Sequence, residues 1–349
     1  MPHPLVSICI PTYNGEAYLA ECLECAIGQT YAPLEILVVD DCSADGTLAI
    51  VDSFMRKDDR IRCERNPENL GLVGNWNRCI SLSRGEYIKF LFQDDLLATN
   101  CVERLVLAAR DGVRFTYCAR DFAFSASTPA SLRDYFEHSK NSISALHAGA
   151  NVMAPDKFSD AVLKDFARNI VGEPTVTLMH RSLFADYGLF NPDIVQNCDT
   201  DFWYRVGTNE TVAYVPEPLA TFRVHVKSTT AQNGASPKSI FRAGPVDRLL
   251  MLHECALNPT FDRLRKYAIS LDPPNDLVGM FYDQAHWARQ GAEEDASQLQ
   301  STEWTPLGEL RRMAQRYPAI MKKPPLKYLV ARKGRSVRAA WENLKAKLL

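Results

Sequence analysis

The sequence predicts an α/β protein in which a mainly parallel sheet is flanked by helices and is followed by a helical C-terminal extension. Over roughly the first 120 residues, short apolar segments alternate with segments of helical periodicity, a pattern typical of parallel strands joined by crossover helices. Two pairs of adjacent acids, Asp40–Asp41 and Asp94–Asp95, follow predicted strands. Because ligands of such sheets bind at the carboxyl ends of the strands, the acids indicate a functional edge.

The individual elements follow from apolar periodicity and turn residues. In the first part we predict strands at Val6–Ile10, Glu35–Val39, Ile61–Cys63 and Tyr87–Phe92, and helices at Tyr18–Gln29, Thr47–Phe54, Val73–Leu82 and Cys101–Ala109. Residues 122–168 are rich in Ser and Ala and are interpreted as a variable insertion with helical fragments. Further on we predict strands at Thr175–Met179, Val212–Val215 and Leu219–Val224, a helix over Asp199–Val206, and a helical pattern from Lys238 onward.

Composition and charge are those of a globular protein with an unusual tail. The 349 residues are 46% hydrophobic and 23% charged, with a net charge of −2. Residues 322–349 hold nine of the 40 Lys and Arg residues but only one of the 42 acids, so the remainder carries a net charge of −10. The tail is therefore basic while the rest of the chain is acidic, and such an asymmetry is a hint about the binding partners of the protein.

Ten cysteines are scattered through the chain, and the only close pair is Cys22 and Cys25. A structural zinc site needs a second pair or histidines at ligand spacing, and neither occurs. We interpret the cysteines as reduced thiols of a cytoplasmic protein. A strand is predicted almost at the first residue, and no apolar run reaches about 18 residues, so we expect neither a signal peptide nor a membrane span.

Two common nucleotide-binding motifs are absent. The first predicted strand is followed by Pro11-Thr-Tyr-Asn-Gly-Glu-Ala17, which is not the Gly-x-Gly-x-x-Gly of a dinucleotide site, and no P-loop sequence occurs. A ligand with phosphates would then need another positive charge. A divalent cation held by Asp94 and Asp95 could supply it, because Mg²⁺ and Mn²⁺ bind through carboxylates and substrate phosphates. The alternative is a solvated pair that caps the next helix.

Four ordered blocks resemble the family 2 glycosyltransferases of the GT-A fold, a Rossmann-like fold. They are "VSICIPTYNGEAYLAECLECAIGQTYAPLEILVVDDCSADGT", "NLGLVGNWNRCI", "RGEYIKFLFQDD" and "NCDTDFWYR", within residues 5–228. The resemblance implies transfer of a sugar from a nucleotide-diphosphate sugar, most simply a UDP-sugar, to an acceptor hydroxyl with inversion, assisted by Mn²⁺ or Mg²⁺. It also implies a domain over residues 1–235, with a donor half at 1–120 and an acceptor half at 121–235, before a helical region at 236–349.

The resemblance assigns donor binding to residues at strand ends and nearby turns: Pro11, Thr12, Tyr13, Asp41, Asn69, Gly71, Arg78 and Asp94. The ring of Tyr13 would pack on the base and Asp41 would bind its edge. Asp41 as a helix cap, Gly71 as an ordinary turn glycine and Arg78 as a solvated side chain are the alternatives.

Metal binding is assigned to Asp95, Asp94 and His225. Asp95 would ligate the cation that bridges the diphosphate, and Asp94 would contact the ribose or the cation. His225 lies in "FRVHVKS", which resembles a late block of the family in which a His holds the metal or diphosphate, although a lone His is also common in a structural role.

The catalytic base is assigned to Asp199, which must accept the proton of the attacking hydroxyl. The family has Glu where this chain has Cys198, a departure that puts the orientation of the base in doubt. Glu173, Trp203 and Asp201 are assigned to the acceptor side. Trp203 could equally be a core residue, and Asp201 a first-turn acid favoured by the helix dipole.

The tail at 322–349 has apolar residues at helical spacing between its basic residues, which is typical of a helix on an anionic membrane surface. Packing on the protein itself or on a second subunit is the alternative. A saccharide or lipid-linked saccharide acceptor, a place at the inner face of the cytoplasmic membrane and a role in bacterial surface polysaccharide or glycolipid synthesis would suit such a tail. No nucleic-acid partner is expected.

Two other functions stay open. A nucleotidyltransferase shares the need for nucleotide and metal but attacks phosphorus, so it would not need Asp199. A catalytically silent nucleotide-binding scaffold subunit is suggested by the replacement of Glu with Cys198.

Overall fold

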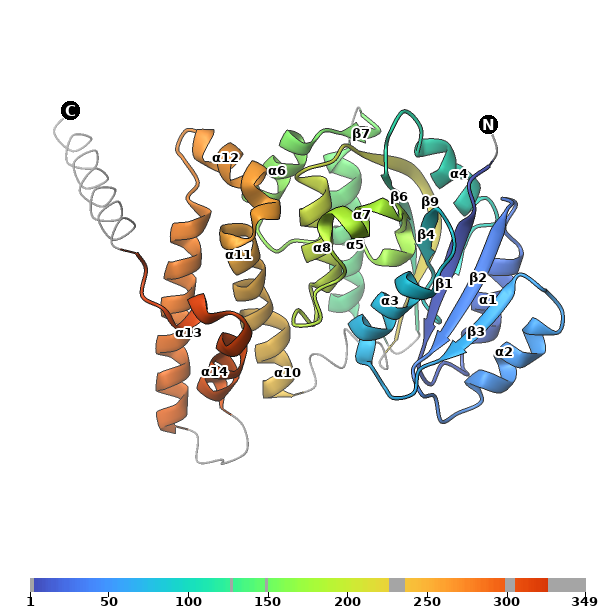
Figure 1. Cartoon of the computed structure of the whole chain (residues 1–349), viewed down its shortest axis with the longest axis horizontal. Helices are drawn as coiled ribbons and strands as arrows, with labels where there is room; N and C mark the ends of the chain where they lie inside the picture. Colours follow the sequence, from blue (N-terminus) through green and yellow to red (C-terminus); the bar gives the residue numbers. More distant parts are fainter. Residues whose placement is uncertain (1–2, 126–127, 148–149, 226–235, 299–304, 326–349) are drawn as a thin grey trace. The chain divides into compact units, whose positions relative to one another are not determined.

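The structure is a computed structural model that describes residues 3–125, 128–147, 150–225, 236–298 and 305–325. The chain divides into two compact units, with the boundary after residue 235. The first unit contains the sheet and the second is helical (Figure 1).

The first unit is built on a nine-stranded mixed sheet with the order β3-β2-β1-β4-β8-β6-β9-β5, in which β7 also pairs with β9. The strands are β1 (Val6–Thr12), β2 (Leu34–Asp40), β3 (Ile61–Arg65), β4 (Tyr87–Phe90), β5 (Leu96–Leu97), β6 (Phe115–Phe124), β7 (Val152–Met153), β8 (Thr177–His180) and β9 (Val212–Val224). Strands β1 to β4 are mutually parallel, as are β6 and β9, while β8, β5 and β7 pair antiparallel with their neighbours. The predicted α/β class is confirmed.

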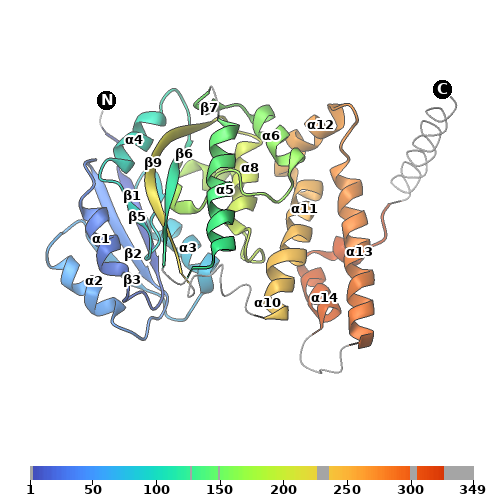
Figure 2. The same cartoon turned by 180° about the vertical axis from the view of Figure 1, so that it is seen from behind.

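Helices cover both faces of this sheet. They are α1 (Leu19–Ile27), α2 (Thr47–Met55), α3 (Gly71–Leu82), α4 (Cys101–Ala108), α5 (Ala130–Leu146), α6 (Pro155–Lys164), α7 (Ser182–Tyr187) and α8 (Cys198–Gly207). Helices α3, α7 and α8 lie on the near face in Figure 1, and α1, α2 and α5 lie on the face seen in Figure 2. All seven residues of β1 and of β2 are buried, as expected for parallel strands covered on both sides.

Two of the longer strands differ from the sequence prediction, and the two-residue strands β5 and β7 were not predicted. Strand β6 begins at Phe115, so part of the segment interpreted as an insertion belongs to the middle of the sheet. Its pattern is obscured by Thr116 and Arg120, two polar residues that are buried. Strand β9 is continuous where two strands were predicted. Its register against β6 shifts at the segment that contains Pro216 and Pro218, since proline lacks the N–H of a regular ladder.

The second unit consists of helices α10 (Pro237–Phe241), α11 (Asp247–Leu257), α12 (Asp262–Ser270), α13 (Leu277–Gln298) and α14 (Pro306–Arg316), with short turns between them. Its described core includes Leu249, Phe261, Phe281 and Leu310, all fully buried. A buried acid, Glu309, is paired with Arg242 and Arg312. The helical pattern predicted from Lys238 onward therefore corresponds to a packed unit.

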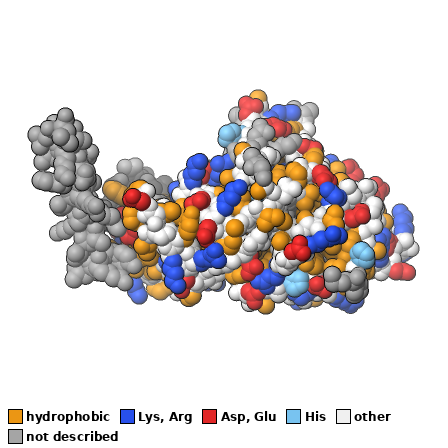
Figure 3. Space-filling model, turned by 90° about the horizontal axis from the view of Figure 1, so that it is seen from above, with side chains coloured by type: hydrophobic (Ala, Val, Ile, Leu, Met, Phe, Trp, Pro, Cys, Tyr) orange, Lys and Arg blue, Asp and Glu red, His pale blue; other side chains and the backbone are white. Residues whose placement is uncertain are grey.

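The predicted basic tail lies outside the described residues from 326 onward. Across the described residues, every helix is too short or too polar to cross a bilayer. On the face shown in Figure 3, Lys and Arg side chains are interspersed with Asp and Glu.

Candidate active site

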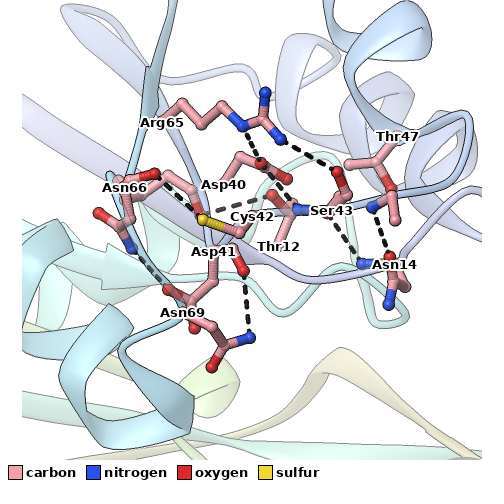
Figure 4. A network of polar contacts seen from close by, with 12 residues as sticks. Thr12, Asn14, Asp40, Asp41, Cys42, Ser43, Thr47, Arg65, Asn66 and Asn69 are labelled. Carbon is pink, nitrogen blue, oxygen red and sulfur yellow. Dashed lines mark hydrogen bonds and ion pairs between the residues drawn. The ribbon is translucent and has the colours of Figure 1, made fainter.

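The loops that follow β1 and β2 are bound to each other by a polar network (Figure 4). Buried Asp40, the last residue of β2, accepts a hydrogen bond from the backbone N–H of Ser43 at 3.1 Å and pairs with Arg65 at 3.5 Å. Across the network, the N–H of Asn14 donates to the Ser43 hydroxyl at 2.9 Å, and the Asn14 side-chain oxygen accepts from Ala44 N at 2.9 Å. The carboxyl ends of these two strands therefore form one braced rim.

Asp41 is buried and holds the start of α3. Its Oδ1 accepts from Leu70 N at 2.8 Å and from Asn66 Nδ2 at 2.8 Å, and its Oδ2 accepts from Gly71 N at 2.9 Å. Asn69 donates to the Asp41 carbonyl at 3.2 Å, and Gly71 has a φ of 73°, which favours glycine. The predicted donor-binding residues Asp41, Asn69 and Gly71 are thus brought together, with Asp41 capping α3 rather than the helix after β2.

The remaining predicted donor residues fall into two groups. Pro11 and Thr12 are buried within β1, whereas Tyr13 just beyond it is 51% exposed. Gln93 fixes this position, because its side chain accepts from Tyr13 N at 2.9 Å and donates to Tyr13 O at 3.1 Å. Arg78 is exposed on α3. Tyr13 therefore offers the aromatic surface that the prediction requires, next to the turn that carries the acidic pair.

Asp94 and His225 face each other at this turn. His225 Nε2 lies 2.9 Å from Asp94 Oδ2, and both side chains keep some exposure to solvent. Arg223 locks the two segments together: its Nε donates to the Asp94 carbonyl at 2.9 Å and its guanidinium lies 4.5 Å from the centre of the Tyr18 ring. The structure therefore joins two predicted metal residues that are 131 positions apart in the sequence.

Asp95 is the next residue after Asp94 and, unlike Asp94 and His225, is almost fully buried. The Thr175 hydroxyl donates to its Oδ2 at 2.6 Å, and Arg223 N donates to its Oδ1 at 3.1 Å. Burial raises the pKa of Asp95 well above its usual range, and the charge of Asp94 raises it further. The Thr175 carbonyl in turn accepts from Lys89, whose side chain is fully buried.

Asp94, His225 and Asp95 could bind a divalent cation if a bound diphosphate supplied the remaining oxygen ligands. Within the ranges that the structure describes, no group of three or more His, Cys, Asp or Glu side chains is placed to hold a metal. Asp94 Oδ2 and His225 Nε2 can supply one carboxylate and one imidazole, and Asp95 lies next to them. Two protein ligands plus phosphate oxygens are a normal complement for Mg²⁺ or Mn²⁺, so the set fits a cation that binds together with a diphosphate.

Asp199 is the second residue of α8 and its side chain is nearly buried, with 8% of the residue exposed. Its Oδ1 accepts from Thr200 N at 2.6 Å and from the Thr200 hydroxyl at 3.2 Å, and its Oδ2 accepts from Asn169 at 3.0 Å. Burial raises the pKa of Asp199 to about 7, and the charge of Glu173 contributes in the same direction. A carboxyl with this pKa can accept a proton near neutral pH.

Glu173 connects the two acidic centres electrostatically. Its charge raises the pKa of both Asp95 and Asp199, so the three acids lie within electrostatic range of one another. Glu173 itself pairs with the buried Arg120 of β6, with Nε and Oε2 3.0 Å apart. Glu173 therefore acts electrostatically on both acids and has a compensating cation, while its place on the acceptor side stays a prediction.

The other two acceptor-side predictions need correction. Trp203 is fully buried, stacks on Phe115 and donates to the Gly172 carbonyl at 2.9 Å. The prediction that its ring stacks on a sugar is wrong, because no part of the ring reaches the surface. Asp201 is likewise buried and pairs with Arg205 on the same helix at 2.8 Å, so its role is structural.

Sequence reasoning missed Lys89, Arg120 and Asn169. Thr175 belongs to the segment Glu173-Pro174-Thr175, which resembles the acceptor-side wall of the family, and Arg223 was interpreted as a possible phosphate contact. Their hydrogen bonds to Asp95 emerge only in the structure. The two buried cations carried no signal, because a single Lys or Arg in an apolar strand has no diagnostic spacing.

The fold, with acids at the carboxyl ends of its strands, is the one expected for an enzyme of the glycosyltransferase class. The chain belongs to the family described as Glycosyl transferase family 2, which it matches over residues 7–188, just over half its length. This confirms the resemblance and the GT-A fold expected from it.

A curated relative agrees with this assignment, and two solved structures share the fold. The chain is 29% identical over 141 residues to the putative teichuronic acid biosynthesis glycosyltransferase TuaG of Bacillus subtilis, covering 40% of this chain and 55% of TuaG. TarS 1–349 of S. aureus in complex with UDP-GlcNAc matches 81% of this chain and 80% of its own, with a TM-score of 0.56 and 16% identity. The mannosyltransferase PcManGT of Pyrobaculum calidifontis, in complex with GDP-Man and Mn²⁺, matches 98% of this chain and 88% of its own, with a TM-score of 0.51 and 17% identity.

Proposed function

We propose that this glycosyltransferase moves a sugar from a nucleotide-diphosphate sugar to an acceptor hydroxyl with inversion of the anomeric carbon. The observation that carries the proposal is Asp199, a nearly buried acid whose pKa of about 7 suits a general base. The nucleotide-sugar donors in the structures of TarS and PcManGT support the donor class, with UDP- and GDP-sugars as the first candidates.

Donor binding is proposed at the rim formed by the ends of β1, β2 and β4. The exposed ring of Tyr13 packs on the base, and the rim at Asp41 supplies polar contacts for the nucleoside. Asp94, His225 and Asp95 would hold Mn²⁺ or Mg²⁺ together with the diphosphate, and the cation would act as a Lewis acid that stabilises the leaving group. The Mn²⁺ bound in PcManGT supports this use of a metal.

In the proposed step, the acceptor oxygen attacks the anomeric carbon as the bond from that carbon to the diphosphate oxygen breaks. The proton of the hydroxyl passes to a carboxylate oxygen of Asp199, and direct displacement inverts the carbon. Glu173 raises the proton affinity of Asp199, while Arg120 limits the accumulated negative charge. The chain itself thus supplies the proton acceptor and its electrostatic setting.

The Asp199→Asn variant tests the base. The amide cannot take the proton, so we expect transfer to fall by about 10²- to 10⁴-fold, the usual contribution of general base catalysis, while nucleotide binding persists. A thermal-shift panel of UDP-, GDP- and dTDP-sugars with Mn²⁺ selects the donor, and release of the nucleoside diphosphate then gives the rate. Asp52→Asn, which neutralises an exposed acid on α2, is the matched control. Transfer at the parental rate in Asp199→Asn would refute the assignment.

The Asp95→Asn variant tests the metal. We expect it to lose the Mn²⁺-dependent part of the thermal shift that the donor produces, because the neutral amide cannot offset the charge of the cation. The same loss should follow from adding a chelator to the parental protein. A donor-induced shift that is equal with and without Mn²⁺ would contradict metal dependence.

A role in bacterial surface polysaccharide or glycolipid synthesis is proposed for the acceptor side. The name of TuaG, which refers to teichuronic acid biosynthesis, supports a polysaccharide product. Attachment of the basic tail to an anionic membrane is part of this proposal. It is tested by sedimentation of the full chain with phosphatidylglycerol vesicles and with neutral vesicles. Equal recovery with both would rule out a charge-driven attachment.

A further inference from the structure

Asn169 stands out because every polar atom of its amide is used. Its Oδ1 accepts from Val171 N at 3.1 Å and from Gly172 N at 2.8 Å, and its Nδ2 donates to the Gly172 carbonyl at 3.1 Å and to Asp199 Oδ2 at 3.0 Å. Because backbone N–H groups can only donate, the amide oxygen must face them. The Nδ2 group is therefore directed at Asp199 by the turn itself.

The turn that carries Asn169 is held from the protein core. Gly172 has a φ of 121°, a conformation that favours glycine, and a Cβ at this position would lie 2.2 Å from the Arg120 guanidinium. The Gly172 carbonyl also accepts from Trp203, which is fully buried. A chain of contacts thus runs from the core through the turn and the Asn169 amide to the carboxylate.

The two oxygens of Asp199 are not equivalent. Oδ1 accepts two hydrogen bonds, both from Thr200, whereas Oδ2 accepts one, from Asn169, within the described part of the chain. A carboxylate oxygen has two lone pairs, so Oδ2 retains one acceptor direction. Because Asn169 occupies one lone pair of Oδ2, its position sets the orientation of the second, unoccupied lone pair.

We propose that Asn169 is a positioning residue for the base, and that its Nδ2 donates to Asp199 Oδ2 so that the second lone pair of this oxygen receives the acceptor hydroxyl. The inference deepens the proposed function, since it rests on Asp199 being the base. It assigns a role to a segment that lies 30 residues before Asp199 in the sequence.

The charged surroundings of Asp199 are consistent with such a role. Glu173 raises its pKa and Arg120 lowers it. Helices α6 and α7 pack on α8, and their charged side chains are exposed to solvent: Asp156, Lys157, Asp160, Lys164 and Asp186. On α8 itself, Asp201 is paired with Arg205. The neutral amide of Asn169 thus favours the ionised carboxylate without adding charge.

The first test is the pH dependence of transfer in Asn169→Asp. This isosteric change keeps an oxygen that can accept from Val171 N and Gly172 N, but it replaces the donor to Asp199 with a second carboxylate. We expect the acid limb of the pH–rate profile to move up by about one pH unit or more, because a like charge replaces a hydrogen-bond donor. An unmoved limb would overturn the proposal.

The chain offers a matched control in Asn77, whose amide braces another turn. Asn77 donates to the Phe190 carbonyl at 2.9 Å and accepts from Phe190 N at 3.1 Å. Asn77→Asp therefore makes the same chemical change in a similar structural setting. We expect it to lower the melting temperature without moving the acid limb. An equal movement of the limb in both variants would show that only the loss of a brace matters, and would overturn the proposal.

The second test needs no turnover. We would measure the urea unfolding midpoint of Asn169→Ala from about pH 5 to about pH 9, with and without Asp199→Asn, around the pKa of Asp199 near 7. The midpoint lost on removing the amide should grow with pH, because the lost hydrogen bond stabilises the ionised carboxylate. In the Asp199→Asn background the loss should no longer depend on pH. The same pH dependence in both backgrounds would overturn the inference.

The two tests separate the inference from the proposed function. If the pH-dependent coupling is found but the parental protein transfers sugar from none of the donors, the contact to Asp199 is supported and the proposed function fails. If transfer occurs and the coupling is absent, the proposed function stands and the positioning role fails.

Discussion

The electrostatic link between Glu173 and Asp199 leads to a sharp prediction about pH. Glu173→Gln removes a negative charge that raises the pKa of Asp199, and it leaves the positive charge of Arg120 less compensated. Both effects favour the ionised form of Asp199. The pKa of Asp199 should therefore fall below its value of about 7, and the enzyme should keep its rate to lower pH.

The expected size follows from the surroundings of the pair. A single charge close to a carboxyl shifts its pKa by about 1 to 3 units, as is typical of a carboxyl beside an arginine. The Glu173 side chain is 19% exposed and is paired with Arg120, so solvent partly screens it and the lower end of this range applies. We expect the acid limb of the pH–rate profile to move down by about one unit.

The assay is the initial rate of nucleoside diphosphate release at limiting donor concentration, measured from about pH 5 to about pH 9. Stability gives a parallel readout. Because the pKa of folded Asp199 is raised from 3.8 to about 7, its contribution to stability is present below about pH 4 and is lost as the pH rises through about 7. In Glu173→Gln this loss should be smaller and should be complete at a lower pH.

The control variant is Glu217→Gln, which also removes a carboxylate paired with an arginine, here Arg104. It should leave the acid limb in place. The reasoning would be refuted if Glu173→Gln left the limb unmoved or shifted it upward, because Asp199 would then not sense the charge of Glu173.

Three further predictions concern stability and are measured by urea unfolding. Gly172→Ala should cost about 3 kcal/mol or more, because a φ of 121° strains alanine and its Cβ would lie 2.2 Å from the end of the Arg120 side chain, which is buried and paired with Glu173. Gly112→Ala, at a φ of 83° with open space around it, should cost about 1–2 kcal/mol. Equal costs would contradict the clash. Asp41→Ala should cost about 2–4 kcal/mol without any ligand, since it leaves the N-terminus of α3 uncapped. Lys89→Met should cost about 1–3 kcal/mol, because two carbonyl groups lose a buried donor; an unchanged midpoint in either variant would show that the contact contributes nothing.

Much of the donor side could be predicted from sequence because its signals are local. The strand that ends at Asp40 and the turn that carries Asp94 and Asp95 each combine an apolar run with acids directly after it. Local signals could not predict the hydrogen-bond partners and the burial of each acid. Asp41 is occupied by the start of α3, and Asp95 lies behind Asp94 and is held by Thr175.

The acceptor side was harder to predict because its residues are defined by long-range contacts. Trp203 and Asp201 have the residue types of a sugar site, yet both are buried at 2% exposure or less. Glu173, in contrast, keeps 19% of its side chain exposed and is paired with Arg120 from the missed strand β6. Residue type alone could not separate these cases, since burial depends on how α8 packs against the sheet.

By itself, the sequence determined the class of fold, the family and the acids that the chemistry needs, because apolar periodicity and strand-end carboxylates are set by neighbouring residues. Only the tertiary structure decided the surroundings of each acid. The pKa of Asp199 is raised by burial and by the charge of Glu173, and its Oδ2 accepts a hydrogen bond from Asn169. Each of these influences comes from a segment distant in sequence, and solvent exclusion and electrostatic coupling exist only once those segments are packed together.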